Sequence, residues 1–289
     1  MTMTRHPSVA ARPRTRRSMN PWKAVTYAVL VVGVVVWLLP FVWMLLGSVK
    51  TPGEVLQRPP TWWPHHFTLE NFRTWLTELN FGQFFTNSMV VALVTVLGNI
   101  LFCSMVGYAL AKLEFRGKKI LFGLVMVTLM VPGIVTFIPL FVIVSKLGLV
   151  NSYLALILPF LTQPIGVFLM RQFMSAIPDP LLEAARIDGA GELRIFFRIV
   201  LPLCGPPIAT LGILTFLSSW NNFLWPLVAA QSEKMYTLPV ALSLYSTGEN
   251  ATNYGLLLAG SVLIITPIVL LFVFLQRHFV QGIATTGLK

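Results

Sequence analysis

Six long apolar stretches without a single charged residue divide this 289-residue chain. At a rise of about 1.5 Å per residue, each stretch is long enough to cross about 30 Å of hydrocarbon as a helix. The chain is 56% hydrophobic and only 11% charged, which is too apolar for a soluble globular protein. The sequence therefore predicts an all-α polytopic membrane protein with six transmembrane helices, at residues 25 to 46, 88 to 111, 120 to 144, 153 to 170, 204 to 230 and 254 to 275.

The basic residues in the connecting segments predict the orientation. With the N-terminus in the cytoplasm, 16 of the 21 Lys and Arg residues lie inside and five lie outside, as the positive-inside rule favours. Both chain ends are thus predicted to be cytoplasmic, with a basic tail at residues 1 to 24 and one six-helix membrane domain at residues 25 to 289. The same topology accounts for the net charge of +11, so no nucleic-acid partner is expected.

The cytoplasmic loop at residues 171 to 203 holds eight charged side chains. Burying each in a bilayer would cost about 2.5 to 3.5 kcal/mol, so the loop is expected to lie in water or against another protein. It contains the pattern EAA-x3-G-x9-I-x-LP, which runs from Glu183 through Gly189 to Pro202. The residues of this pattern that are candidates for a docking role are Glu183, Ala184, Ala185, Asp188, Gly189, Ile199, Leu201 and Pro202.

Local signals predict a short helix within this loop. Asp179 is a suitable N-cap, Pro180 suits the first helical position, and Gly189 suits the left-handed position that ends a helix. The helix then runs from residue 181 to 188, and a second one ends near residue 202. Spacing of i, i+3, i+4 and i+7 places four residues on one face, namely Leu181, Ala184, Ala185 and Asp188.

The EAA-x3-G-x9-I-x-LP pattern resembles the cytoplasmic coupling motif of the permease subunits of binding-protein-dependent ABC importers, which docks in a cleft on the ATPase. Further segments resemble the sugar-importer branch, in particular the second permease of maltose-type systems. They are Thr86-Asn87-Ser88, Gly107-Tyr108-Ala109-Leu110-Ala111-Lys112, Ser219-Trp220-Asn221-Asn222-Phe223 with Pro226-Leu227, Thr237-Leu238-Pro239, and Phe279-Val280-x-Gly282-x4-Gly287-x-Lys289.

The resemblance implies the type I ABC importer permease (MetI-like) architecture and a location in the bacterial cytoplasmic membrane. It also implies a permease that forms half of a translocation pathway for a sugar or related polar solute. The expected partners are a second homologous permease, two ATPase subunits and an extracytoplasmic solute-binding protein. ATP and Mg would be bound by the ATPase subunits, and no cofactor or metal is expected in this chain.

The polar residues within the fifth stretch have two candidate roles. Ser218, Ser219, Asn221 and Asn222 are unfavourable against lipid, so they are expected to face the bundle interior, another subunit or a wet cavity. Hydrogen bonding between helices is one role. Lining the route of a polyhydroxylated solute is the other, with Trp220 able to stack on a sugar ring.

The segment at residues 50 to 86, rich in proline and aromatic residues, is expected outside the membrane. Since Trp favours the membrane interface, an ordered cap at the outer headgroups is one interpretation. Contact with an extracytoplasmic partner is the other.

Two other function classes fit the sequence poorly. An ion-coupled carrier normally places an Asp, Glu or His within the membrane, and the six stretches contain none, although a sodium site made of backbone carbonyls stays open. The chain has no G-x4-G-K-[ST] nucleotide loop, and its two cysteines, Cys103 and Cys204, suggest neither a disulfide nor a metal site. The prediction is therefore a transport subunit and not an enzyme.

Overall fold

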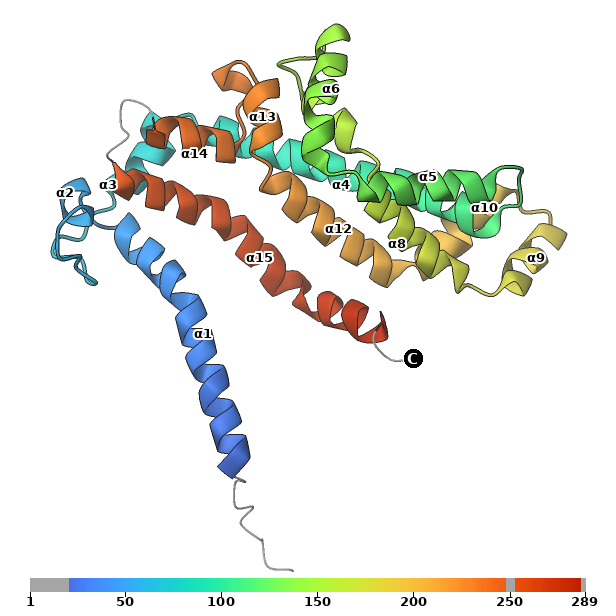
Figure 1. Cartoon of the computed structure of the whole chain (residues 1–289), viewed down its shortest axis with the longest axis horizontal. Helices are drawn as coiled ribbons and strands as arrows, with labels where there is room; N and C mark the ends of the chain where they lie inside the picture. Colours follow the sequence, from blue (N-terminus) through green and yellow to red (C-terminus); the bar gives the residue numbers. More distant parts are fainter. Residues whose placement is uncertain (1–20, 248–252, 287–289) are drawn as a thin grey trace, which may run out of the picture. The chain divides into compact units, whose positions relative to one another are not determined.

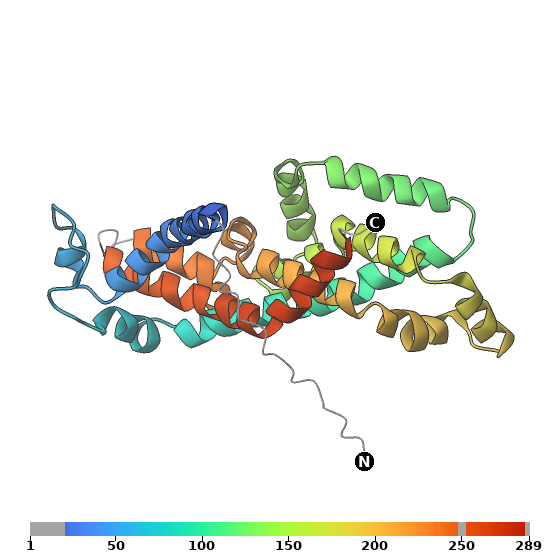
Figure 2. The same cartoon turned by 90° about the horizontal axis from the view of Figure 1, so that it is seen from below.

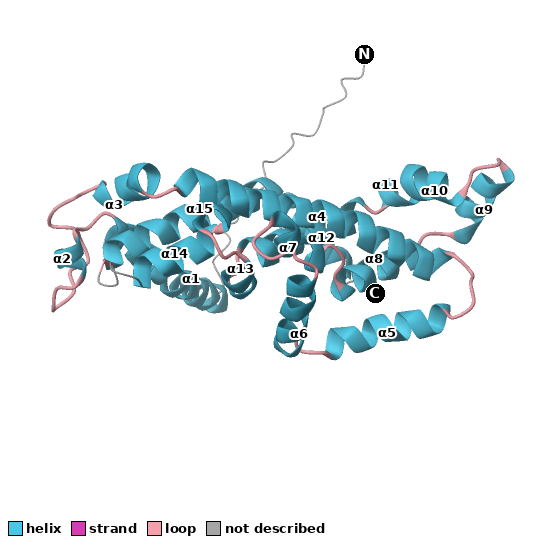
Figure 3. Ribbon diagram, turned by 90° about the horizontal axis from the view of Figure 1, so that it is seen from above, coloured by secondary structure: helices cyan, strands magenta, loops and turns pink. Residues whose placement is uncertain are grey.

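The computed structural model describes residues 21 to 247 and 253 to 286, and this part of the chain is helical without strands (Figures 1 and 3). The long helices are α1 (Pro21–Ser48), α4 (Phe81–Lys112), α5 (Lys118–Met130), α6 (Gly133–Lys146), α8 (Pro164–Ser175), α12 (Gly205–Trp220) and α15 (Tyr254–Thr286). The shorter elements are α2 (Pro52–Val55), α3 (Glu70–Arg73), η1 (Thr74–Glu78), α7 (Tyr153–Ile157), η2 (Leu158–Phe160), α9 (Asp179–Ile187), α10 (Glu192–Ile195), η3 (Phe196–Val200), α11 (Leu201–Leu203), α13 (Leu224–Ala229), η4 (Glu233–Met235) and α14 (Leu238–Thr247).

The chain divides into two units, Met1–Trp43 and Met44–Lys289. The predicted basic tail lies almost wholly outside the described residues, and α1 begins at Pro21, inside the predicted tail. The first unit contains most of α1. In the second unit α4 packs along α8 and α12, and α12 packs against α15 (Figures 1 and 2).

Three of the six predicted spans are single helices. Val25–Ser48, Phe81–Lys112 and Tyr254–Phe274 are each long and apolar enough to cross a membrane. The other three are candidate spans only as bent pairs: Lys118–Met130 with Gly133–Lys146 at 105°, Tyr153–Phe160 with Pro164–Ser175 at 43°, and Glu192–Leu203, which lies in the predicted cytoplasmic loop, with Gly205–Trp220 at 82°. The described part of the chain therefore supplies six spans when each bent pair counts as one.

The third, fourth and fifth predicted stretches are not continuous helices, which corrects the prediction of one helix for each of them. α5 ends before Pro132, because a residue that precedes proline is disfavoured in helical backbone. α12 ends at Trp220, where the Asn221 side chain donates to the carbonyl of Leu217 at 2.9 Å. Such side-chain bonds to the backbone compete with helix continuation, and α13 is a separate helix.

Two of the sequence motifs meet in the structure. Nδ2 of Asn87 donates to the carbonyls of Lys234 at 2.8 Å and Tyr236 at 2.9 Å. Oγ of Ser88 accepts a hydrogen bond from the backbone N–H of Leu238 at 2.8 Å. The Thr86-Asn87-Ser88 and Thr237-Leu238-Pro239 motifs are therefore two halves of one contact, which fixes the start of α14 against α4.

Residues 50 to 80 form an ordered cap. The carboxylate of Glu54 accepts hydrogen bonds from the N–H of His65 at 2.7 Å and from Oγ1 of Thr61 at 3.2 Å. Nδ2 of Asn71 donates to the carbonyls of Ser48 and Lys50, each at 2.9 Å. The segment is thus ordered, as one interpretation expects, but its place at the headgroups and any partner contact stay predictions.

Candidate functional site

The loop that carries the EAA pattern folds into a short helix with a well-formed end. Beyond α9, Gly189 has a φ of 79°, the left-handed value that the sequence predicts. The N–H of Ala190 donates to the carbonyl of Ala185 and that of Gly189 to Arg186, each at 3.0 Å. These two bonds form a Schellman motif, so the chain leaves α9 in a defined direction.

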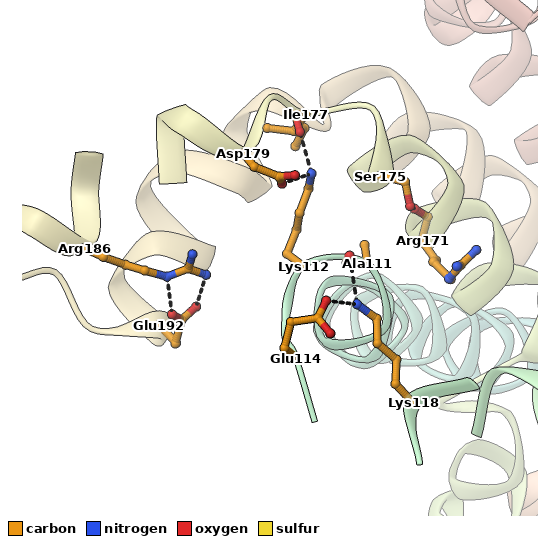
Figure 4. Close-up of polar contacts among 10 residues, drawn as sticks. All are labelled: Ala111, Lys112, Glu114, Lys118, Arg171, Ser175, Ile177, Asp179, Arg186 and Glu192. Carbon is orange, nitrogen blue, oxygen red and sulfur yellow. Dashed lines mark hydrogen bonds and ion pairs between the residues drawn. The ribbon is translucent and has the colours of Figure 1, made fainter. Parts of the chain in front are cut away.

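The N-cap of α9 lies one residue earlier in the chain than the sequence predicts. Pro178 is the N-cap and Asp179 is already helical, and no side-chain capping bond is present there. The Asp179 carboxylate instead pairs with Nζ of Lys112 at 2.6 Å (Figure 4). The competing interaction comes from 67 residues away in sequence and is absent from any local pattern.

The two alanines of the pattern have different surroundings. Leu182 is 1% exposed, and Ala185, three residues later, packs half-buried against the same apolar core. Ala184 is exposed. The helical spacing groups Ala184 and Ala185 on one face, but it does not show which side of α9 is buried. The side with Leu182 and Ala185 packs against the core of its own chain.

The remaining face of α9 is open. Glu183, Ala184 and Asp188 are exposed, and Ile187 is 86% exposed. Sequence reasoning missed Ile187, although an isoleucine between Arg186 and Asp188 on a polar face is a usable signal. A single exposed apolar side chain is common on protein surfaces, so Ile187 indicates a contact surface only together with the exposed motif residues around it.

Two side chains of α4 hold the loop in place. Tyr108 and Lys112 are four residues apart and so lie on one face of the helix. Oη of Tyr108 donates to Oε2 of Glu192 at 2.5 Å, and Nε of Arg186 donates to Oε1 of Glu192 at 2.7 Å. Figure 4 shows the Arg186–Glu192 and Lys112–Asp179 pairs. The end of α4 thus binds both α9 and α10, a role that the sequence alone did not reveal.

The pair between Lys112 and Asp179 joins a buried cation to an exposed carboxylate. The Lys112 side chain is 4% exposed and also donates to the carbonyl of Ile177. Its hydrogen bond and its charge hold the pKa of Asp179 below the ordinary value. Since a buried ammonium group needs compensating partners, Lys112 is fixed by this geometry.

In the second half of the EAA pattern, two of the three predicted docking residues contact the core of their own chain. Ile199 and Leu201 pack half-buried against the core that also holds Leu182, whereas Pro202 is exposed. They lie in the helical run Glu192–Leu203, which meets α12 at 82°. Of the predicted docking residues, Glu183, Ala184, Asp188, Gly189 and Pro202 are therefore exposed, while Ala185, Ile199 and Leu201 contact the core.

The four translocation candidates do not share one surface. Ser219 and Asn222 line a cavity of about 80 Å³, and Asn221 lines a separate surface pocket of about 370 Å³. Trp220 is buried, stacks on Phe216 and donates from Nε1 to the carbonyl of Ile264 at 3.0 Å. The structure thus brings two of the four together, and it makes Trp220 a packing residue in this conformation.

Gly189→Val is expected to lower solute uptake by about 5- to 150-fold. A Cβ at this position would meet nothing within 4 Å, so the effect comes from backbone strain at positive φ, about 1 to 3 kcal/mol. Gly189→Asn should retain uptake because asparagine tolerates left-handed backbone. Gly191, also free of contacts but with a φ of −72°, provides the matched control. Equal uptake by Gly189→Val and Gly191→Val would contradict the role of the turn.

Known proteins resemble this chain in sequence and in fold. The family model described as binding-protein-dependent transport system inner membrane component matches residues 103 to 285. The chain is 45% identical over 253 residues to the arabinooligosaccharides transport system permease protein AraQ of Halalkalibacterium halodurans, covering 86% of this chain and 90% of the relative. It is 35% identical over 274 residues to the sulfoquinovosyl glycerol transport system permease protein SmoH of Agrobacterium fabrum, covering 94% and 95%.

A solved structure has the same fold. The chain matches a chain from the crystal structure of a bacterial ABC transporter involved in the import of the acidic polysaccharide alginate, with a TM-score of 0.78 and 22% identity. The match covers 93% of this chain and 100% of that one. The bent spans described above thus belong to a known membrane architecture.

Proposed function

Since the chain belongs to the family of binding-protein-dependent transport system inner membrane components, we propose that it couples ATP hydrolysis on a partner subunit to solute import through helix α9. The chain is a transmembrane permease subunit of an ABC importer, a transport component and not an enzyme. Its fold is the all-α MetI-like membrane fold.

The observation that carries the proposal is the exposed, rigidly held face of α9. Its backbone ends in a Schellman motif, and its inner side is fixed by Leu182 and by the Lys112–Asp179 pair. The outer face presents Glu183, Ala184, Ile187 and Asp188 to a partner. A short helix that is held at both ends transmits a displacement to α4 without being deformed itself.

The partners follow from the family. A binding-protein-dependent transporter includes an ATPase and a solute-binding protein. We assign to this complex two ATPase subunits, which bind ATP and Mg, and a second homologous permease that forms the other half of the pathway. The extracytoplasmic solute-binding protein would meet the outer end of the chain.

The solute is proposed to be a sugar or a related polar compound. The names of the two relatives refer to arabinooligosaccharides and to sulfoquinovosyl glycerol, both rich in hydroxyl groups. Arabinose-containing oligosaccharides are the first solutes to test, because the relative named for them is 45% identical. Ser219, Asn221 and Asn222 would pair with sugar hydroxyls only in a conformation that brings them to one pathway, since they line two separate spaces here.

The location is the inner membrane. We place both chain ends in the cytoplasm, because that orientation keeps 16 of 21 basic residues inside and puts α9 on the side where ATP is available. The cap at residues 50 to 80 then lies outside.

Uptake in cells that lack only this chain tests the function. Without the chain, radiolabelled solute retained by the cognate binding protein should not accumulate, and re-expression should restore uptake. Proteoliposomes with this chain alone should take up nothing under a proton or sodium gradient; uptake there would support a secondary carrier instead.

Cysteine labelling in intact cells tests the orientation. A cysteine at exposed Arg194 should resist impermeant thiol reagents, and one at exposed Gln57 should react. The native Cys103 and Cys204 are buried, so they should not react with the reagent.

A further inference from the structure

A small polar cavity lies where two broken spans meet α4. Its lining includes Thr95 of α4, Gln163 at the break before α8, and Asn222 at the break between α12 and α13. Ser218 and Ser219 of α12 complete the polar part of the lining. Five hydrogen-bonding side chains from α4, α12 and the two helix breaks therefore converge on one space.

The Thr95 hydroxyl is the unusual member of this set. Thr95 is 1% exposed, and its Oγ1 has no hydrogen-bond partner among the described residues. Four other helical threonines donate to the carbonyl four residues earlier, namely Thr86, Thr128, Thr210 and Thr266. Thr95 does not make that bond and lines the cavity instead. A buried hydroxyl without a partner is unfavourable, and a ligand in the adjoining cavity would satisfy it by accepting or donating a hydrogen bond.

The size of the cavity decides which ligand fits. Its volume is about 80 Å³, whereas pockets for drug-sized molecules have about 300 Å³ or more. A sugar chain of two or more rings is therefore excluded in this conformation. One water needs only about 10 to 15 Å³ of such volume together with two to four polar partners, and both conditions are met here.

We propose that this cavity is a water-binding site in which a small cluster of ordered waters bridges Thr95 to the polar side chains at the two helix breaks. The waters accept from and donate to Oγ1 of Thr95 and reach the amides of Gln163 and Asn222. The site explains how polar residues at interrupted spans are stable at membrane depth.

The water site gives two of the translocation candidates a different role. Ser219 and Asn222 are hydrated through this site before any solute arrives, and they do not form a sugar subsite in this conformation. The inference concerns the folded chain and does not depend on the coupling role of α9.

The sign of a stability change tests the proposal. Thr95→Val keeps the shape of the side chain and removes only the hydroxyl. In the purified, assembled transporter, loss of a water-mediated bond should lower the Tm by about 2 to 4 °C. Ser104, a fully buried residue of the same helix whose Oγ also has no partner, does not line this cavity and is the matched control. Ser104→Ala should leave the Tm equal or higher, because it removes an unsatisfied group.

Either of two results would overturn the proposal: an unchanged or raised Tm for Thr95→Val, which indicates a dry cavity, or an equal fall for both variants, which indicates a general effect of hydroxyl loss. A density map of the assembled transporter that resolves ordered waters gives a second measurement. Density at about 2.7 to 3.0 Å from Oγ1 of Thr95 would support the site. A map with a dry or lipid-filled cavity would contradict it even if a variant failed to fold.

Discussion

Ala184→Asp is expected to reduce ATP-driven uptake by about 100-fold or more while the chain still folds and inserts. Ala184 is exposed, so the new carboxylate is hydrated in the free chain and loses its water only when α9 docks on the ATPase. An unpaired charge buried in a contact costs about 3 kcal/mol or more, and every 1.4 kcal/mol corresponds to a factor of ten. Co-purification of the ATPase with the tagged permease, together with uptake in proteoliposomes, measures the effect.

The neighbouring alanine supplies the matched control. Ala185 packs against its own chain's core beside Leu182, so Ala185→Asp should lower the abundance and thermal stability of the permease itself. The two variants thus separate a docking defect from a folding defect. Normal ATPase binding and full uptake by Ala184→Asp would show that this face of α9 is not the coupling surface.

Gly107→Val is expected to destabilise the membrane domain by about 3 kcal/mol or more and so to abolish detectable folded protein. A Cβ on Gly107 would lie 2.9 Å from the backbone nitrogen of Arg171 and 2.9 Å from Cβ of Met170, because α4 and α8 touch there through their backbones. Backbone cannot move aside as a flexible side chain does, so this overpacking is at the severe end of the range. Thermal unfolding and membrane abundance report the loss.

A second glycine of α4 tests whether the contact or the residue type matters. Gly82 is exposed, and a Cβ there would meet nothing within 4 Å. Gly82→Val should therefore leave the domain folded, with a modest change that reflects helix propensity alone. If Gly107→Val were as stable as Gly82→Val, the close α4–α8 contact would not exist in the assembled protein.

The local features of the chain were predictable from sequence because each depends on a few neighbouring residues. The apolar stretches follow from the cost of placing charge in hydrocarbon, which applies residue by residue. The left-handed Gly189 follows from the absence of a Cβ, and it was predicted correctly. The family was also identifiable from the EAA pattern, whose spacing is a property of the linear sequence.

Features that depend on distant partners were not predictable in this way. Asp179 has the sequence of an N-cap, but Lys112 binds its carboxylate. One interpretation had Trp220 stack on a sugar ring, and in this structure its side chain is buried and donates to the carbonyl of Ile264 in α15. In each case a contact between residues far apart in the chain, or between helices, overrode the local signal.

The sequence by itself determined the membrane class, the apolar stretches, the short helix that ends at Gly189 and the family. Only the tertiary structure decided which side of α9 is free, because Leu182 and Ala185 attach to a core built from α4 and α8. It also decided where the third, fourth and fifth spans break and which polar residues meet at the cavity. Periodicity records which residues of a helix share a face, whereas packing against other helices selects the face that is buried.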